Sequence, residues 1–426
     1  MAEFRTEVFQ NEYLSEGATD VHGVVSVTCT GAGVAGRSSG TEAAEIVIVD
    51  TSGSMDMPPN KMAAARRAAK VALDEIVDGT WFAVVAGHTV AQMVYPSHPG
   101  LAKMTEVTRR EASEAVGGLR SGGATAIGAW IAAATELFEQ APAGQRHAIL
   151  LTDGKIEGEP EGALDAALVN AAGKFQCDCR GIGSDWVVDE LRTIAHALMG
   201  TVDIVAKPED LEADFEQMMR AAMQRGVADV RLRVWAPQGS EVLFVRQVAP
   251  QVEDLTAKAV RISPLVVEVP TGAWSDESRD YHVAVRVPTA PVGNERLAAR
   301  VEVVVADQVL AKGLVKAIWS TDTNLTTRID PAVAHYTGQA QLADVIQRGL
   351  AAKSSGDERT ATVLLGEAAK LAHDTGNEDT TRLLAKVVDV VDVEAGTVRL
   401  KQAIDKTDEM ALDTRSTKTT RIRREP

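Results

Sequence analysis

The stretch AEIVIVDTSGS, residues 44–54, decides the fold of this chain. Its first half, 44–49, is a strongly apolar run of the kind that is buried on both faces of a parallel sheet. A short polar loop follows at once, and apolar residues at helical spacing begin at 61 and continue to 77. A buried strand, a polar loop and a helix in this order indicate the first unit of an α/β domain.

The same alternation continues to about residue 207. Further strands are predicted at 81–87, 91–96, 147–154, 176–183 and 202–207, with helices at 105–119, 126–140, 163–175 and 189–199. A last helix, 208–226, begins at Pro208 and ends at Gly226, as proline and glycine at those positions favour. The pattern predicts a doubly wound, Rossmann-like α/β domain with a mostly parallel sheet over 43–226.

On both sides of the α/β domain, apolar and polar residues alternate with the period of β-strands. Short runs with period-two alternation, such as VADVRLRVWAP at 227–237, predict an antiparallel β-sandwich over 227–325. The stretch VHGVVSVTCTG at 21–31 alternates in the same way, and no helix follows it at α/β spacing. We therefore expect residues 1–42 to belong to the sandwich, so that the α/β domain is an insertion in a β-domain.

The C-terminal part has two textures. Amphipathic patterns over 326–405 predict two or three helices that form a small bundle or a tetratricopeptide-like hairpin. The end of the chain, 406–426, is polar and rich in Thr and Arg, which predicts a disordered tail.

Composition excludes some classes of function. The formal net charge is −16, which argues against nucleic-acid binding because phosphate contacts need clustered Lys and Arg. No stretch approaches the roughly 18 apolar residues of a membrane span, and the first residues show no apolar signal segment. The three cysteines, Cys29, Cys177 and Cys179, are too few and too close for a disulfide framework, and we expect buried thiols in a reducing compartment. These features predict a cytoplasmic protein.

The polar loop carries the chemistry. Asp50, Ser52 and Ser54 follow the first strand, where loops beyond the carboxyl ends of parallel strands form the ligand crevice. Thr125 precedes a predicted helix and Asp153 ends a predicted strand, so both should reach the same crevice. Carboxylate and hydroxyl oxygens suit a hard cation. The sequence predicts that these five residues converge on Mg²⁺, with Mn²⁺ or Ca²⁺ as alternatives.

Residues 44–207 resemble a von Willebrand factor A domain, and the pattern D-x-S-x-S…T…D resembles its metal-ion-dependent adhesion site. The resemblance implies that Ser52, Ser54 and Thr125 contact the metal directly, whereas Asp50 and Asp153 act through hydrogen-bonded water. It also implies that an Asp or Glu of a partner protein fills the remaining metal position.

The tail carries a second candidate. Thr419 is followed three residues later by Ile422, which resembles the phosphothreonine ligand of forkhead-associated domains, and Thr417 and Thr420 lie beside it. The architecture resembles a group of bacterial, especially actinobacterial, von Willebrand A proteins linked with Ser/Thr kinases and forkhead-associated proteins. The alternative interpretation is a solvated tail that aids solubility.

The sequence gives less support to an enzymatic function. The run IVDTSG is superficially similar to an aspartic-protease loop, but Ser52 takes the glycine position and no second loop of this kind appears. No G-x-S-x-G turn is present, and none of the eight histidines lies in a triad context. A metal-dependent hydrolase would lack a visible base. The sequence therefore predicts a non-enzymatic, Mg²⁺-dependent interaction protein, with a phosphorylated signalling adaptor as the alternative.

Overall fold

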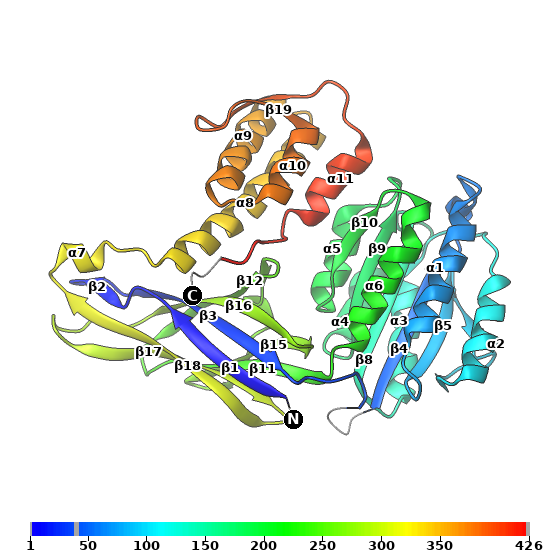
Figure 1. Ribbon diagram of the computed structural model, residues 1–426, viewed down its shortest axis with the longest axis horizontal. Coiled ribbons are helices and arrows are strands. Elements are labelled where there is room, and N and C mark those ends of the chain that lie inside the picture. The colour runs from blue at the N-terminus through cyan, green and yellow to red at the C-terminus, as the bar shows by residue number, and fades with distance from the viewer. Residues whose placement is uncertain (1, 38–41, 423–426) are drawn as a thin grey trace. The chain divides into compact units, whose positions relative to one another are not determined.

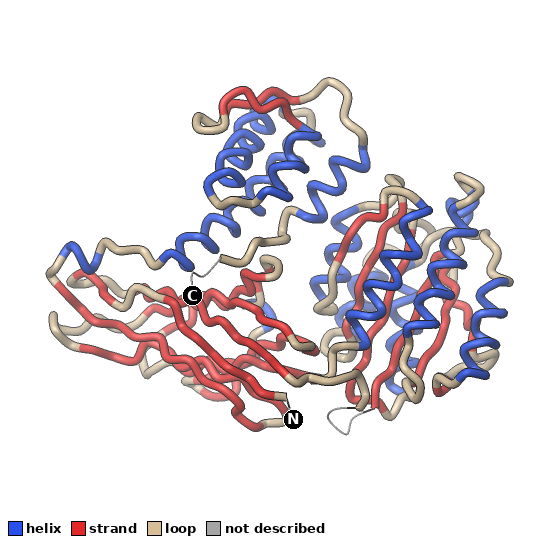
Figure 2. Tube along the Cα trace, in the orientation of Figure 1, coloured by secondary structure: helices blue, strands red, loops and turns tan. Residues whose placement is uncertain are grey.

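The computed structural model describes residues 2–37 and 42–422, which divide into two compact units. The first, the α/β unit, consists of Ala32–Ala228 with Ala273–Ser275. The second, the sandwich unit, comprises 2–31, 229–272 and the chain from 276 onward. Figure 1 shows the helices and strands of each unit, and Figure 2 separates them by type. Among the described residues, no helix is long and apolar enough to span a membrane.

The α/β unit is built on one mixed sheet, with strand order β10-β9-β8-β4-β5-β6 and β7 paired to β5. All strands are parallel except β6 and β7, which run antiparallel to β5. The prediction of a doubly wound, mostly parallel sheet is therefore confirmed. The strands are β4 (Glu42–Asp50), β5 (Trp81–Gly87), β6 (Ala91–Tyr95), β7 (Ala102–Lys103), β8 (Ala143–Thr152), β9 (Gln176–Ile182) and β10 (Val202–Val205).

Helices cover both faces of this sheet. The helical elements are η1 (Gly53–Asp56), α1 (Lys61–Glu75), α2 (Glu106–Gly117), α3 (Ile127–Gln140), α4 (Ala163–Ala171), α5 (Val188–Ala197), η2 (Pro208–Asp210) and α6 (Leu211–Met223). Helices α1, α2 and α6 share one apolar core with the sheet, and the alanines of α1 allow close packing there. On the opposite face Trp130 of α3 packs against Gly87, where a Cβ would clash with the indole ring.

A closed cluster of charges lies within this sheet. The imidazole of His147 contacts Glu45 through Nδ1 at 2.8 Å and Asp178 through Nε2 at 2.9 Å. Asp178 also accepts hydrogen bonds from the backbone N–H and the hydroxyl of Thr201, and it pairs with Arg225 at 3.4 Å. Burial alone would lower the pKa of His147, but the two carboxylates outweigh burial and raise it to about 9. The cluster is thus an imidazolium between two carboxylates, satisfied from within.

The sandwich unit contains two sheets, and the N-terminal segment belongs to both. One sheet has the order β1-β3-β16-β12-β13 and the other β14-β15-β11-β17-β18-β2. Strand β3 pairs antiparallel with β16, and β2 pairs with β18. The predicted insertion of the α/β domain into a β-domain is therefore confirmed. The strands are β1 (Glu3–Phe9), β2 (Tyr13–Ser15), β3 (Asp20–Thr30), β11 (Val227–Trp235), β12 (Glu241–Ala249), β13 (Glu253–Asp254), β14 (Val260–Ser263), β15 (Val266–Trp274), β16 (Glu277–Arg286), β17 (Glu295–Val305) and β18 (Gln308–Ser320), with a short η3 (Thr256–Lys258).

The helical region contains a hairpin that the sequence pattern did not predict. After α7 (Thr323–Thr326), helices α8 (Pro331–Ser354), α9 (Glu358–Asp374) and α10 (Glu378–Val387) follow one another. The prediction of helices alone over 326–405 is wrong here, because the chain enters β19 (Val388–Asp392), which pairs with β20 (Thr397–Leu400). The valine-rich run VVDVV explains the change, since β-branched side chains favour strands.

The prediction of a disordered tail over 406–426 is wrong for the described part, 406–422. Helix α11 (Lys406–Arg415) begins at its cap Asp405, whose side chain accepts from the backbone N–H of Thr407. Leu412 is fully buried in the core of the helical region. The following residues, 416–422, lie against the sandwich and α8. The prediction of disorder rested on the average composition of the tail, which is polar. That average does not reveal the few side chains, such as Leu412, that anchor the segment.

Candidate metal centre

Loops from three places in the chain meet at the carboxyl end of the parallel sheet. The hydroxyl oxygens of Ser52 and Ser54 lie 2.9 Å apart, and Ser54 Oγ donates to Asp153 Oδ1 at 2.6 Å. The loop before α3 is attached to the first loop, because the backbone N–H of Gly53 donates to the carbonyl of Gly123 at 3.0 Å. Three of the five predicted residues are thus in direct contact.

Thr125 faces the same space, over Gly154. A Cβ added at Gly154 would lie 2.9 Å from Thr125 Oγ1 and 3.3 Å from Ser54 Oγ. The two hydroxyls therefore border a small cradle that exists because Gly154 has no side chain. The structure brings Thr125 to the site, as the sequence predicted.

Asp50 orients the loop from beneath. Its side chain is fully buried, and its two oxygens accept from the Ser52 N–H at 2.7 Å and from the Thr152 hydroxyl at 2.5 Å. Burial raises the pKa of Asp50 to about 6, although the hydrogen bonds from Thr152 and Ser52 oppose the shift. Because both oxygens are engaged within the protein, this carboxylate fixes the serine loop in place.

Sequence reasoning missed Lys61, which is a buried part of this site. Lys61 is 3% exposed, its ammonium group forms an ion pair with Asp153, and it lies 3.4 Å from the carbonyl oxygen of Ser54. A cation in the first turn of a helix opposes the helix dipole, so α1 tolerates Lys61 there because Asp153 offsets the charge. A lysine at a helix start normally indicates an exposed residue, and nothing in the sequence signals its burial.

The donor set fits a hard divalent cation. The hydroxyls of Ser52, Ser54 and Thr125 and the carboxylate of Asp153 are all oxygen ligands. Ser54 and Thr125 border the cradle over Gly154, and Ser52 and Asp153 contact Ser54. In the described ranges, no three side chains among His, Cys, Asp and Glu form a group suited to a metal ion. The oxygen set therefore fits Mg²⁺, Mn²⁺ or Ca²⁺ better than a soft metal.

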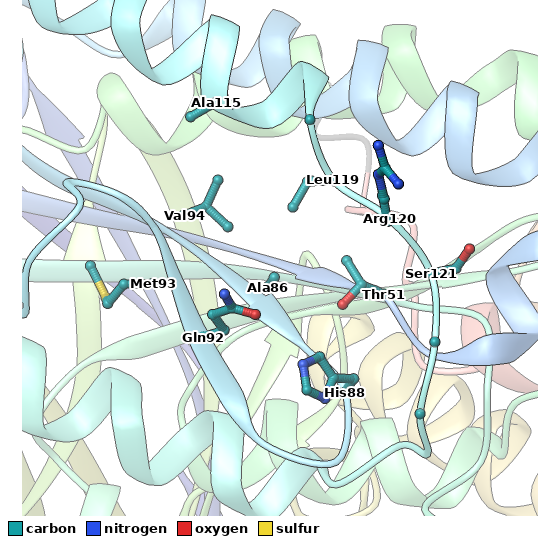
Figure 3. Close-up of a pocket in the computed structure, with 13 residues that line it drawn as sticks. Thr51, Ala86, His88, Gln92, Met93, Val94, Ala115, Leu119, Arg120 and Ser121 are labelled. Carbon is teal, nitrogen blue, oxygen red and sulfur yellow. The ribbon is translucent and has the colours of Figure 1, made fainter.

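A cavity opens beside the serine loop (Figure 3). Its volume is about 560 Å³, and Thr51, the neighbour of Asp50, forms part of its wall. Apolar and polar side chains share its lining, which includes Ala86, Met93, Val94, Ala115, Leu119, His88, Gln92, Arg120 and Ser121. The loop is joined to this wall, because the backbone N–H of Gly122 donates to the Thr51 carbonyl at 2.7 Å. A ligand at the cradle would lie next to this cavity.

The tail threonines lie in the sandwich unit and take no part in the metal centre. The hydroxyl of Thr419 donates to the carbonyl of Val248 at 2.7 Å, and Thr420 Oγ1 accepts from Gln339 Nε2 at 3.4 Å. Thr417 is half-buried beside them. Their phosphorylation stays a prediction. The expectation of buried thiols is confirmed, because all three cysteines are free and buried.

Comparison with known proteins identifies related folds. A family model for the von Willebrand factor type A domain matches residues 44–204, and a model for its C-terminal domain matches 370–416. Among the curated proteins none matches this chain. The solved structure of a von Willebrand factor type A protein from Catenulispora acidiphila is 46% identical, with a TM-score of 0.93, and the match covers 99% of this chain and 97% of that one.

Two more distant structures are also similar to this chain, and the first of them shares its fold. The ArnB paralog VWA2 from Sulfolobus acidocaldarius is 15% identical, covers 98% of both chains and has a TM-score of 0.60. Proximal thread matrix protein 1 from the mussel byssus, whose adhesion-type motif holds zinc, is 24% identical over 43% of this chain and 46% of that one, with a TM-score of 0.37. Identity of 46% over nearly the whole chain settles membership: the chain belongs to the von Willebrand factor type A family.

Proposed function

We propose that this protein is a non-enzymatic interaction module, which binds a carboxylate of a partner protein through a divalent cation, Mg²⁺ in the first place. Ser52, Ser54 and Thr125 would hold the ion directly, while Asp50 and Asp153 would orient these hydroxyls and the water between them. The proposal extends to a bacterial protein that acts in the cytoplasm.

The ion pair between Lys61 and Asp153 is the observation that supports the proposal most. Because Lys61 already offsets the charge of Asp153, and because Asp50 accepts two internal hydrogen bonds, the uncharged hydroxyl oxygens are the main ligands left for a cation. Ser54 would offer a lone pair while its proton stays donated to Asp153. Neutral ligands leave most of the charge on a bound cation. Such a cation attracts an external carboxylate strongly, which makes partner binding metal-dependent.

The cavity beside the serine loop supports a protein ligand. A peptide that brings a carboxylate to the metal would place its next side chain over the apolar wall formed by Met93, Val94 and Leu119. Arg120 is exposed at the same cavity and would attract a second acidic group of the partner. We therefore expect an acidic residue next to an apolar one in the binding segment.

The first test measures metal binding by titration calorimetry, with Mg²⁺, Mn²⁺ and Ca²⁺ in turn. Thr125→Ala removes one proposed ligand, and we expect the affinity for Mg²⁺ to fall about tenfold to hundredfold. Thr193→Ala is the matched control, because the hydroxyl of Thr193 is exposed on α5 and bonds only locally to the Asp189 carbonyl among the described residues. Equal Mg²⁺ affinity of the two variants would contradict the site.

The second test is capture of the partner from cells of the source organism, with and without EDTA. We expect EDTA to abolish capture by the wild-type protein and added Mg²⁺ to restore it. Thr125→Ala should capture little at any Mg²⁺ concentration that saturates the Thr193→Ala control. Capture that persists unchanged in EDTA would show that the cation is not the contact.

A further inference from the structure

After a turn at 416–417, the chain up to residue 422 runs without helix or strand along a surface of the sandwich unit formed by β3, β12, β16 and α8, which we call the groove. Its backbone pairs with the turn between β12 and β13. The N–H of Val252 donates to the Thr417 carbonyl at 2.7 Å, the N–H of Thr419 donates to the Pro250 carbonyl at 2.9 Å, and a bridge joins Gln251 to Lys418. This is how a sheet binds an extended peptide.

An arginine anchors the segment. Arg421 contacts both oxygens of Asp280, at 3.1 Å from Nε and 2.9 Å from Nη2, and Nη2 also donates to Ser26 Oγ at 2.6 Å. The hydroxyl of Tyr336 donates to the same carboxylate. A planar guanidinium that meets a carboxylate with two bonds gives geometric specificity as well as attraction.

The two partners of this ion pair differ in exposure. The side chain of Asp280 is fully buried, whereas 38% of the Arg421 side chain is exposed. Burial alone would raise the pKa of Asp280, but hydrogen bonds from Arg421, Ser26 and Tyr336 outweigh it and keep the pKa below its ordinary value. The carboxylate is therefore part of the groove wall, and the arginine reaches it from the surface.

Ile422 and the threonines add selectivity to the groove. Ile422 packs against an apolar cluster formed by Val24, Val248, Ala249, Ala332 and Tyr336. The hydroxyl of Thr419 donates to the Val248 carbonyl at 2.7 Å. His335 Nε2 lies 2.8 Å from the Thr420 carbonyl oxygen, so α8 contacts the backbone of the segment. The groove thus offers the Val248 carbonyl to Thr419, the Asp280 carboxylate to Arg421 and an apolar cluster to Ile422.

We propose that this groove is a peptide-recognition site for an extended Thr-Thr-Arg-Ile segment, and that residues 416–422 occupy it as an exchangeable ligand, so that the tail of a second copy of this chain can take the same place. The segment has no helix or strand of its own. Besides its few backbone bonds and the Thr419 hydroxyl, it is held by a half-exposed arginine and a single isoleucine. It can therefore leave without unfolding the walls, which come from β3, β12, β16 and α8.

The test uses the full-length protein and a labelled synthetic peptide of residues 414–422, followed by fluorescence anisotropy in EDTA, so that the proposed metal site plays no part. In the wild-type chain the tail competes at an effective concentration in the millimolar range, and we expect weak peptide binding. Arg421→Ala weakens the internal ligand, so this chain should bind the peptide at least about tenfold more tightly than wild type does. A peptide with the same Arg421→Ala change should lose that gain.

Two further variants make the result decisive. Asp280→Asn, combined with Arg421→Ala, should abolish the preference for the arginine peptide, because the carboxylate is the arginine acceptor. If circular dichroism shows that Arg421→Ala is unfolded, Ile422→Ala replaces it, since this change removes one apolar contact and keeps the ion pair. Trypsin cleavage after Lys418 reports tail release in each variant. A variant that is folded, is cut at Lys418 and still binds the peptide no better than wild type would overturn the proposal.

Discussion

At the carboxyl end of the parallel sheet, the hydroxyls of Ser52, Ser54 and Thr125 border a shared cradle, whereas nearer the amino end Glu45, His147 and Asp178 contact one another. Both clusters are polar, and both draw on β4 and β8 or the loops that follow them. In the second cluster each charge has an opposite charge beside it. In the first, Asp153 pairs with Lys61, Asp50 is held by two hydrogen bonds, and the hydroxyl oxygens keep lone pairs for a cation. Available donors, rather than the number of charges, distinguish a candidate binding site from a structural cluster.

The largest expected effect comes from breaking the closed cluster. Asp178→Ala removes the carboxylate beside Arg225 and one of the two beside His147, so Arg225 loses this partner while His147 keeps Glu45. We expect the free energy of unfolding in urea to fall by about 3–5 kcal/mol. Asp165→Ala, at an exposed position on α4, is the control and should change it by less than about 0.5 kcal/mol. A folded Asp178→Ala protein that loses metal binding would contradict the separation of the two clusters.

Asp153→Ala tests the pair beneath the cradle. It leaves the buried ammonium of Lys61 without its carboxylate, and we expect a loss of about 3 kcal/mol in stability together with the loss of Mg²⁺ binding. The double variant Asp153→Ala with Lys61→Met removes both charges, so stability should recover while Mg²⁺ binding does not. Recovery of both properties would mean that Asp153 acts only through Lys61.

The pH dependence of stability should report the closed cluster. The pKa of His147 is about 9 in the folded protein, above the 6.5 of an ordinary imidazole, so folding favours the protonated form. Its contribution is therefore fully present below pH 6.5 and is lost as the pH rises through 9, by about 2–3 kcal/mol. Urea titrations between pH 6 and 9.5 measure the slope. His147→Gln should flatten it, and an unchanged slope in that variant would assign the effect to another group.

Arg120→Glu should have the smallest effect, and only on partner binding. The exposed guanidinium lies at the cavity and contributes nothing to the cradle, so we expect Mg²⁺ affinity to stay unchanged. Capture of an acidic partner should weaken about fivefold, and more at low salt than at high salt. Surface plasmon resonance against the captured partner at two ionic strengths measures this. An effect of equal size on Mg²⁺ binding would place Arg120 in the metal site.

The metal centre could be predicted because its residues follow strand ends. In a parallel sheet these ends meet at one edge, so Ser54 and Asp153 are in contact although 99 positions separate them. The closed cluster was missed, although it left a signal. Glu45, His147 and Asp178 are each a titratable residue next to apolar residues in a buried part of a strand, and such residues need a partner.

The burial of Lys61 and the docking of the tail could not be predicted from sequence patterns. The role of Lys61 depends on the side chain of Asp153, 92 positions away, and helix periodicity says nothing about it. The tail was expected to be disordered because composition is an average, whereas its docking depends on Arg421, Ile422 and backbone bonds. A carboxylate such as Asp280 within a β-strand indicates that a cation is needed, but the sequence does not say which one.

The insertion has a consequence for how the chain folds. Strand β3 pairs with β16, and Thr28 contacts Ser278 from 250 positions away. A ribosome needs about 10–50 s to cover that distance, and during this time β3 has only β1 to pair with. Once the α/β unit folds, its ends are adjacent, because the Ala35 N–H donates to the Met223 carbonyl at 2.9 Å. That shortens the effective loop between Thr28 and Ser278 from 250 residues to roughly 60 and lowers the entropic cost of closure by about 1 kcal/mol, so folding of the inserted unit favours the pairing of β3 with β16.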